Sequence, residues 1–197
     1  MNSLKLCLCA AAIIPLAPAQ ATDFIIDAMA NSSSGGVPLS TIFLNAGQTV
    51  TVTASTNDLW SAGALPRFSD ANGLVAVRLA SALDDSGQVP GTQIGADFGL
   101  WTQDGFSAPF GSLVGRVGTQ YQILGTNFTG SFANAGTLEL FYWDSNNGDN
   151  FGTITAHIST VDSGVPEPAT WAMMLIGFGA IGLRIRHRSR AARAAMI

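Results

Sequence analysis

The sequence has few of the residues that form catalytic or covalently linked sites. Its two cysteines, Cys7 and Cys9, lie within the first ten residues, and no lysine follows Lys5. The motifs G-x-S-x-G and H-E-x-x-H, the P-loop and the dinucleotide-binding glycine pattern do not occur. A chain that loses both cysteines with an N-terminal segment has no disulfide, thiol nucleophile or zinc–thiolate site. We therefore expect a protein that is not an enzyme.

Basic residues are also scarce away from the two ends of the chain. Between residues 22 and 165 there are twelve aspartates and glutamates but only three arginines, a formal charge of −9. The whole chain has a net charge of only −4, because the other six basic residues lie in its two ends. Nucleic acid is an unsuitable partner, since its phosphates need a basic face. An acidic domain suits hard cations such as Ca²⁺.

The first 21 residues have the order of parts of a secretory signal peptide. Lys5 supplies a positive charge, and an apolar run extends from Leu6 to Leu16. Ala19-Gln20-Ala21 then matches a cleavage site of the A-x-A type. We therefore expect residues 1–21 to be a signal peptide and the protein to be exported.

The other end of the chain has the features of a membrane anchor. After a linker at residues 161–170, the run from Trp171 to Leu183 has no charged residue, and arginines follow it. An apolar segment followed by arginines is typical of a membrane helix whose C-terminal end is cytoplasmic. The run is shorter than the roughly 20 apolar residues of a stable span, so we expect a marginal transmembrane helix at 171–187 and a cytoplasmic tail at 188–197. The arginines that set this topology are Arg184, Arg186, Arg188 and Arg190.

The tripeptide Pro166-Glu167-Pro168 opens this C-terminal region, with Trp171, the apolar run and the arginines after it. This order resembles the sorting signal of PEP-CTERM proteins, which are substrates of exosortases in Gram-negative bacteria. The resemblance implies that an exosortase recognises and processes an inner-membrane precursor near the motif. It also implies delivery to the cell surface or to an extracellular polysaccharide matrix.

The residues between these ends, 22–160, have the pattern of one domain built of strands. Short apolar or alternating runs recur between glycine-rich turns, and no sustained helical period occurs. This pattern predicts an all-β fold, an antiparallel β-sandwich of about seven or eight strands. The glycine-rich stretch from Asp84 to Ser107 is expected to be a long loop or an irregular hairpin. The expected strands are Phe24–Ile26, Ile42–Leu44, Thr49–Thr53, Leu74–Leu79, Leu113–Val117, Tyr121–Leu124, Leu138–Trp143 and Thr153–Ser159.

One segment of this domain combines several oxygen-bearing side chains. Asp144-Ser145-Asn146-Asn147-Gly148-Asp149-Asn150 holds two carboxylates and three amides between two expected strands. Carboxylate and amide oxygens are among the ligands that Ca²⁺ takes in proteins. The spacing does not fit an EF-hand, because Asp149 stands at the sixth position, where that motif needs glycine. A plain hairpin turn is the alternative, since Asn-Gly is a strong turn signal.

Small glycine-punctuated matches between Asn45 and Ile158 form a further pattern. They include Trp60-Ser61-Ala62-Gly63, Ala71-Asn72-Gly73-Leu74 and Tyr142-Trp143-Asp144. This part of the chain resembles the galactophilic PA-I type lectins, which are small β-sandwiches with one Ca²⁺ that contacts both protein and sugar. The resemblance implies a Ca²⁺-dependent carbohydrate site. The ligands that it implies for the ion are the side chains of Asp144, Asp149 and Asn150, a backbone carbonyl near Asn146 or Asn147, and one near Ala62.

The residues that would contact a sugar depart from the family. Its sugar-contacting histidine falls near Ser69, and the glutamine that follows falls near Asn72. The resemblance therefore implies metal binding without the preference for galactose. Trp60 and Asn72 are the candidate sugar contacts, because Trp60 stands in a loop-like context where an indole stacks on a sugar face. Trp143, within an expected strand, is expected in the core.

Three functions follow from these observations. The first is a Ca²⁺-dependent carbohydrate-binding module at the cell surface or in the extracellular matrix. The second is a structural or interaction component of that matrix with no specific sugar site. The third, an enzyme that acts on extracellular polysaccharide, has only paired aspartates in its favour.

Overall fold

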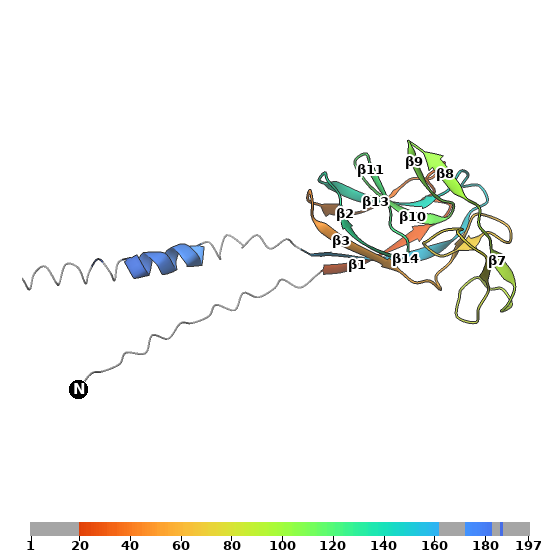
Figure 1. The fold of residues 1–197 in the computed structure, drawn as a ribbon, viewed down its shortest axis with the longest axis horizontal. Coiled ribbons are helices and arrows are strands. Elements are labelled where there is room, and N and C mark those ends of the chain that lie inside the picture. The colour runs from red at the N-terminus through yellow and green to blue at the C-terminus, as the bar shows by residue number, and fades with distance from the viewer. Residues whose placement is uncertain (1–19, 162–171, 183–185, 187–197) are drawn as a thin grey trace, which may run out of the picture. The chain divides into compact units, whose positions relative to one another are not determined.

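The computed structural model describes residues 20–161, 172–182 and 186, which Figure 1 draws as ribbons. The described residues belong to two separate units of the chain. Residues 20–161 form a β domain, and residues 172–182 are helical. The strands of the β domain are β1 (Gln20–Asp27), β2 (Leu39–Leu44), β3 (Thr49–Ala54), β4 (Trp60–Ser61), β5 (Phe68–Ser69), β6 (Arg78–Leu79), β7 (Gln93–Gly95), β8 (Leu100–Gln103), β9 (Phe106–Pro109), β10 (Ser112–Val117), β11 (Gln120–Ile123), β12 (Asn127–Ser131), β13 (Gly136–Trp143) and β14 (Phe151–Val161).

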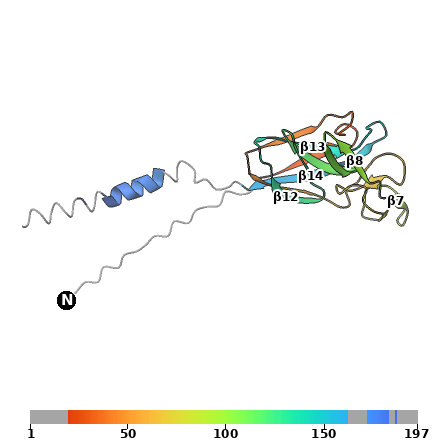
Figure 2. The same ribbon diagram turned by 45° about the horizontal axis from the view of Figure 1, so that its top comes forward.

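The strands form two main antiparallel sheets. The first has the order β12-β3-β14-β4-β5, with β1 paired to β14, and the second has the order β11-β10-β13-β2. Figure 2 gives a turned view of the same strands. Two short pairs, β6-β7 and β8-β9, stand apart from these sheets. The expected all-β antiparallel architecture is confirmed.

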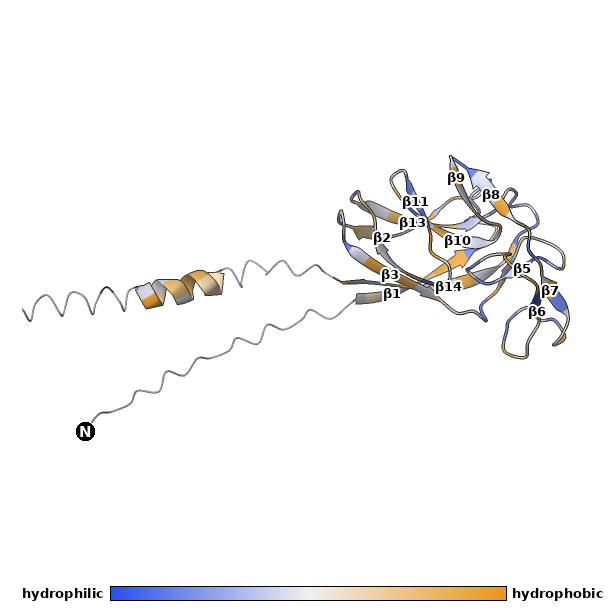
Figure 3. Cartoon of the chain, viewed as in Figure 1, coloured by the Kyte–Doolittle hydropathy of each residue, from blue (hydrophilic) through white to orange (hydrophobic). Residues whose placement is uncertain are grey.

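The core between the two sheets follows from alternation along the strands. In β3, Val50 and Val52 are buried, whereas the three threonines that alternate with them are at least partly exposed. Residues of β13 such as Leu138 and Leu140 join the same buried cluster from the other sheet. Successive side chains of a strand point to opposite faces of its sheet. The apolar face of one sheet therefore packs against the apolar face of the other. Figure 3 colours the β domain by hydropathy, with its apolar residues in orange.

Strand β13 is buried on both faces near its end. Phe141 and Trp143 point away from the main core, and the β8–β9 hairpin covers them with Trp101 and Phe106. The Trp143 Nε1 donates a hydrogen bond to the Trp101 carbonyl at 2.8 Å. The stretch from Asp84 to Ser107, expected as a loop or irregular hairpin, thus contains a hairpin that builds a second aromatic layer.

Seven of the eight expected strands match observed strands over most of their length, and Leu74–Leu79 is the exception. Only Arg78 and Leu79 form a strand there. Leu74 is buried and donates its amide proton to the Phe110 carbonyl, while Val75 and Val77 are exposed. Leu74 therefore packs in the core, and the residues after it form a surface loop.

Several predictions concern the two ends of the chain. Residues 1–19 and the sorting-motif residues lie outside the described part, as do Arg184, Arg188 and Arg190. Gln20 and Ala21 pair with Thr160 and Ser159 in β1, so cleavage after Ala21 leaves Thr22–Asp27 of that strand. Across the described residues, no helix combines the length and apolar character needed to cross a bilayer.

Replacing Trp60 by alanine is expected to destabilise the β domain strongly. Trp60 is fully buried, packs edge-on against Tyr142 with 4.6 Å between ring centroids, and donates from Nε1 to the Gly111 carbonyl at 2.8 Å. Removing a buried tryptophan costs about 3–5 kcal/mol. Denaturant unfolding should show this loss, whereas Phe43→Ala at a largely exposed position should change stability by roughly 0.5 kcal/mol or less. A loss below about 1 kcal/mol for Trp60→Ala would contradict the core role.

Candidate functional site

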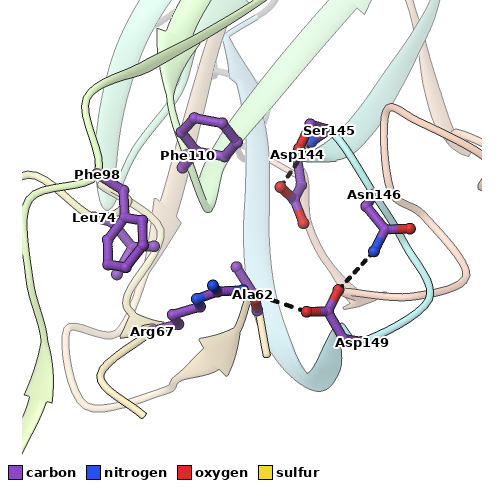
Figure 4. A pocket seen from close by; sticks show the side chains of 9 residues that line it. All are labelled: Ala62, Arg67, Leu74, Phe98, Phe110, Asp144, Ser145, Asn146 and Asp149. Carbon is purple, nitrogen blue, oxygen red and sulfur yellow. Dashed lines mark hydrogen bonds and ion pairs between the residues drawn. The ribbon is translucent and has the colours of Figure 1, made fainter. Parts of the chain in front are cut away.

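The β domain has a pocket at the end where β13 passes into β14. Its volume is about 310 Å³, at the lower end of the range of small-ligand sites. In Figure 4 the two aspartates lie on one side, with Phe98 and Leu74 on the opposite side. The lining residues are Ala62, Arg67, Leu74, Phe98, Phe110, Asp144, Ser145, Asn146 and Asp149.

Asp144 is held by hydrogen bonds at the end of β13. Its backbone N–H and carbonyl both bond to the Ser33 hydroxyl, at 3.1 and 2.8 Å. Its carboxylate accepts the Ser145 N–H at 2.7 Å and is almost fully buried. Burial raises the pKa of the Asp144 carboxyl above its ordinary value, although the bonds from Ser145 and the Asn150 side chain favour the ionised form. A cation in the pocket would offset the cost of this buried charge.

Asn150 and Tyr142 bring two unpaired polar atoms to the same region. Asn150 is fully buried, and its Nδ2 donates to the Ala28 carbonyl at 3.2 Å. Within the described part of the chain, its Oδ1 and the Tyr142 hydroxyl have no hydrogen-bond partner. Burial, with a further contribution from Asp144, raises the pKa of Tyr142 well above its ordinary value. Buried polar atoms are normally paired, so the Asn150 oxygen is suited to a bound ion or ligand.

Asp149 and Arg67 form an ion pair across the pocket. Arg67 Nη1 donates to Asp149 Oδ2 at 3.3 Å and to the Ala62 carbonyl at 3.2 Å. The other oxygen of Asp149 accepts the Asn146 Nδ2 at 2.9 Å. Gly63 allows this approach, because a Cβ at its positive φ of 112° would lie 2.5 Å from Asp149 Oδ2. A cationic group therefore lies where two of the oxygens expected around Ca²⁺ converge.

Two of the four predicted metal ligands, Asn147 and Asn150, lie outside the pocket lining, and Asn147 also points away from it. Its side chain lies against the loop at Gly35, where an added Cβ would be 2.8 Å from Asn147 Oδ1. Its backbone carbonyl accepts the Asn150 N–H at 3.3 Å, as in a turn. Among the described residues, no three histidine, cysteine or acidic side chains gather as a metal cluster. Only two carboxylates line the pocket, so any further oxygen ligands would have to come from amide and carbonyl groups.

The two predicted sugar contacts are also elsewhere. Trp60 is fully buried in the main core, where it has a packing role in place of the predicted stacking on a sugar. Asn72 is exposed, but its side chain bonds to Thr126, with Nδ2 donating to Oγ1 at 3.1 Å and Oδ1 accepting the backbone N–H at 3.1 Å. Neither residue lines the pocket.

The residues that face the acidic loop were not predicted from the sequence. Phe98 comes from the glycine-rich stretch that was expected to be a loop, and Phe110 follows the β8–β9 hairpin. Arg67 is one of only three arginines in the acidic domain, which was the available signal. Its partner Asp149 is 82 residues away along the chain, so only the fold shows the pair.

Comparison with known proteins identifies the C-terminal region. Residues 164–189 match the PEP-CTERM protein-sorting motif. The chain carries a PEP-CTERM sorting motif. The motif implies a secreted protein that is anchored or processed at the membrane and then sorted to the cell surface.

The fold was compared in the same way. Among solved structures, the chain is similar to the EclA N-terminal domain, a PllA-like lectin, at 20% sequence identity and a TM-score of 0.43. The match covers 70% of this chain and 94% of that one. A comparison with curated proteins gives no match.

Replacing Asp144 by asparagine is expected to stabilise the metal-free domain at neutral pH. Because the folded pKa of Asp144 lies above its ordinary value of 3.8, ionisation costs stability at pH 7. That cost disappears as the pH falls through the folded pKa toward 3.8. The variant keeps the acceptor for Ser145 and should gain on the order of 1 kcal/mol at pH 7.

Denaturant unfolding in a chelator at pH 7 and at pH 4 tests this expectation. The gain should shrink at the lower pH. Asp97→Asn is the matched control, because Asp97 is exposed and accepts the Gly99 N–H in a loop. An Asp144→Asn variant that is less stable than the wild type at pH 7 would contradict the claim that the buried carboxylate destabilises the metal-free domain.

Proposed function

We propose that this protein is an exported, surface-sorted carbohydrate-binding protein whose pocket holds one sugar unit together with a Ca²⁺ ion. The observation that carries the proposal is the set of oxygens in one place. It comprises the carboxylates of Asp144 and Asp149 and the Ala62 carbonyl, from residues that line the pocket. Asn150 lies outside the lining but bonds to the Asp144 side chain, and its Oδ1 has no hydrogen-bond partner among the described residues. An apolar wall faces these oxygens.

The oxygens fit calcium by number, type and charge. Ca²⁺ takes six to eight oxygen ligands and accepts carboxylates, amide oxygens and carbonyls together. Asp144 carries a buried charge, and no arginine or lysine of the described residues bonds to its carboxylate. The ion would supply the missing positive charge and vacant positions for hydroxyl groups. The guanidinium of Arg67 already bonds to the Ala62 carbonyl and to Asp149. These oxygens are therefore placed to interact with a positive charge.

The opposite wall of the pocket fits the ring of a sugar. Phe98, Phe110 and Leu74 line it, and Phe98 is 40% exposed. A sugar has hydroxyl groups along its edge and an apolar face of ring carbons, so it needs polar groups on one side and an aromatic surface on the other. The volume of about 310 Å³ suits one sugar unit of a longer glycan.

The position of the pocket in the β domain also supports the proposal. Strand β14 begins at Phe151, just after the acidic loop, and ends at Val161, where the chain leaves the domain. Eleven residues of strand span about 35 Å. The other chain connection lies at the same end, because Gln20 pairs with Thr160. A domain attached through Val161 therefore has its pocket at the end remote from the attachment.

Calcium should raise the melting temperature of the full chain. A ligand that binds only the folded state stabilises it by mass action, by about 2.7 kcal/mol at a hundredfold excess over Kd, which corresponds to several degrees. Calorimetry in a detergent without a sugar headgroup measures both binding and melting. Asp144→Ala should fold but lose the response, and Mg²⁺ should replace Ca²⁺ poorly because it prefers a rigid octahedral site. No binding heat at millimolar Ca²⁺ would remove the metal site and favour a structural matrix component.

Replacing Pro166 and Pro168 together by alanine is expected to block sorting. We propose that an exosortase reads Pro166-Glu167-Pro168 and that the arginines hold the topology of the precursor in the membrane. The double variant should accumulate as an unprocessed membrane-bound precursor, detected by its size in cell fractions. Pro90→Ala, at an exposed loop position of the β domain, is the control and should be sorted normally. Normal surface delivery of the double variant would contradict the role of the tripeptide.

A further inference from the structure

Arg67 differs from the other two arginines of the β domain. Arg78 bonds to Asp70 and to the Thr56 carbonyl, and Arg116 bonds to Glu139 and Tyr121, each through more than one nitrogen. Both of these side chains are 26% exposed, whereas that of Arg67 is 42% exposed and lines the pocket. The first two arginines hold strands and loops together. Arg67 has the accessibility of a residue that meets a ligand.

The guanidinium of Arg67 uses only one of its three nitrogens as a donor within the described residues. Its two hydrogen bonds, to Ala62 and Asp149, both come from Nη1. Among the described residues, Nε and Nη2 have no acceptor. The ring of Phe98 lies 5.4 Å from its Cζ and positions the planar group by a cation–π contact. A carboxylate is the group that pairs with two parallel N–H donors of a guanidinium.

The charges in the pocket set a condition on such a ligand. One arginine and two aspartates line the pocket, a formal charge of −1 that repels a carboxylate. With the divalent cation of the proposed function the formal charge becomes +1, which one carboxylate neutralises. A neutral sugar leaves that charge in place. The pocket therefore matches a ligand that combines a sugar ring with a single negative charge.

We propose that Arg67 makes the pocket select a sugar acid, a uronate, over the neutral sugar with the same ring. This inference rests on the proposed function, because it names the class of sugar for the same pocket. The sugar ring faces Phe98 and Phe110, and the carboxylate pairs with Nε and Nη2 of Arg67. Arg67 also competes with the cation for Ala62 and Asp149, so its removal should tighten Ca²⁺ binding.

Titration calorimetry of the full chain, in a detergent without a sugar headgroup, tests the selection. The ligands are galacturonate and galactose, glucuronate and glucose, and acetate as a simple carboxylate, each with Ca²⁺ and with a chelator. In Ca²⁺ the wild type should bind at least one uronate about tenfold or more tightly than its neutral partner. Arg67→Gln should reduce uronate affinity to that of the neutral sugar and bind Ca²⁺ several-fold more tightly. Arg116→Gln makes the same change in net charge outside the pocket and should keep the preference.

The outcomes separate this inference from the proposed function. Equal affinity for the members of both pairs, or a preference that survives Arg67→Gln, would overturn the role of Arg67 and leave Ca²⁺-dependent sugar binding in place. Acetate that binds as tightly as the uronates would overturn selection of a sugar acid. A wild type that binds neither Ca²⁺ nor any of the four sugars would overturn the proposed function, and this inference with it.

Discussion

The pocket depends on the turn that follows β1, because that turn holds both ends of the acidic loop. The Ser33 hydroxyl bonds to the backbone of Asp144, where the loop begins. At the other end, Ala28 donates its N–H to the Gly152 carbonyl at 3.0 Å and accepts the Asn150 side-chain amide. Strand β1 pairs with β14 along its whole length. The first strand of the exported domain thus positions a loop more than a hundred residues later.

This support explains how the domain tolerates two groups that cost stability. A buried, ionised Asp144 and an unpaired Asn150 oxygen are unfavourable in an apolar interior. A flexible loop would relax until both groups reached water. Here the hydrogen bonds to Ser33 and Ala28 hold the Asp144 backbone and the Asn150 side chain in place. Groups held at such a cost are typical of binding sites, where a ligand offsets the penalty.

The sequence allowed prediction of the features that depend on local pattern. Alternation in β3 identified its buried face, and the dense oxygen-bearing side chains of residues 144–150 identified the acidic side of the pocket. Features that depend on distant contacts were missed or misjudged. Trp60 stood in a loop-like context, yet the Gly111 carbonyl and Tyr142 receive it in the core. Arg67 meets Asp149 only because β4 and β5 lie beside the start of β14.

The charge of the domain would act in opposite directions on the two proposed ligands. A formal charge of −9 between residues 22 and 165 attracts Ca²⁺ and repels an acidic glycan over long distances. At physiological ionic strength these fields are screened within about 8 Å. Selection therefore depends on groups inside the pocket, where screening is weakest. Of the described residues, Arg67 is the one basic residue that lines it. In the proposed function, a single arginine beside two aspartates makes recognition of an acid conditional on a cation, which the acidic surface itself would help to concentrate.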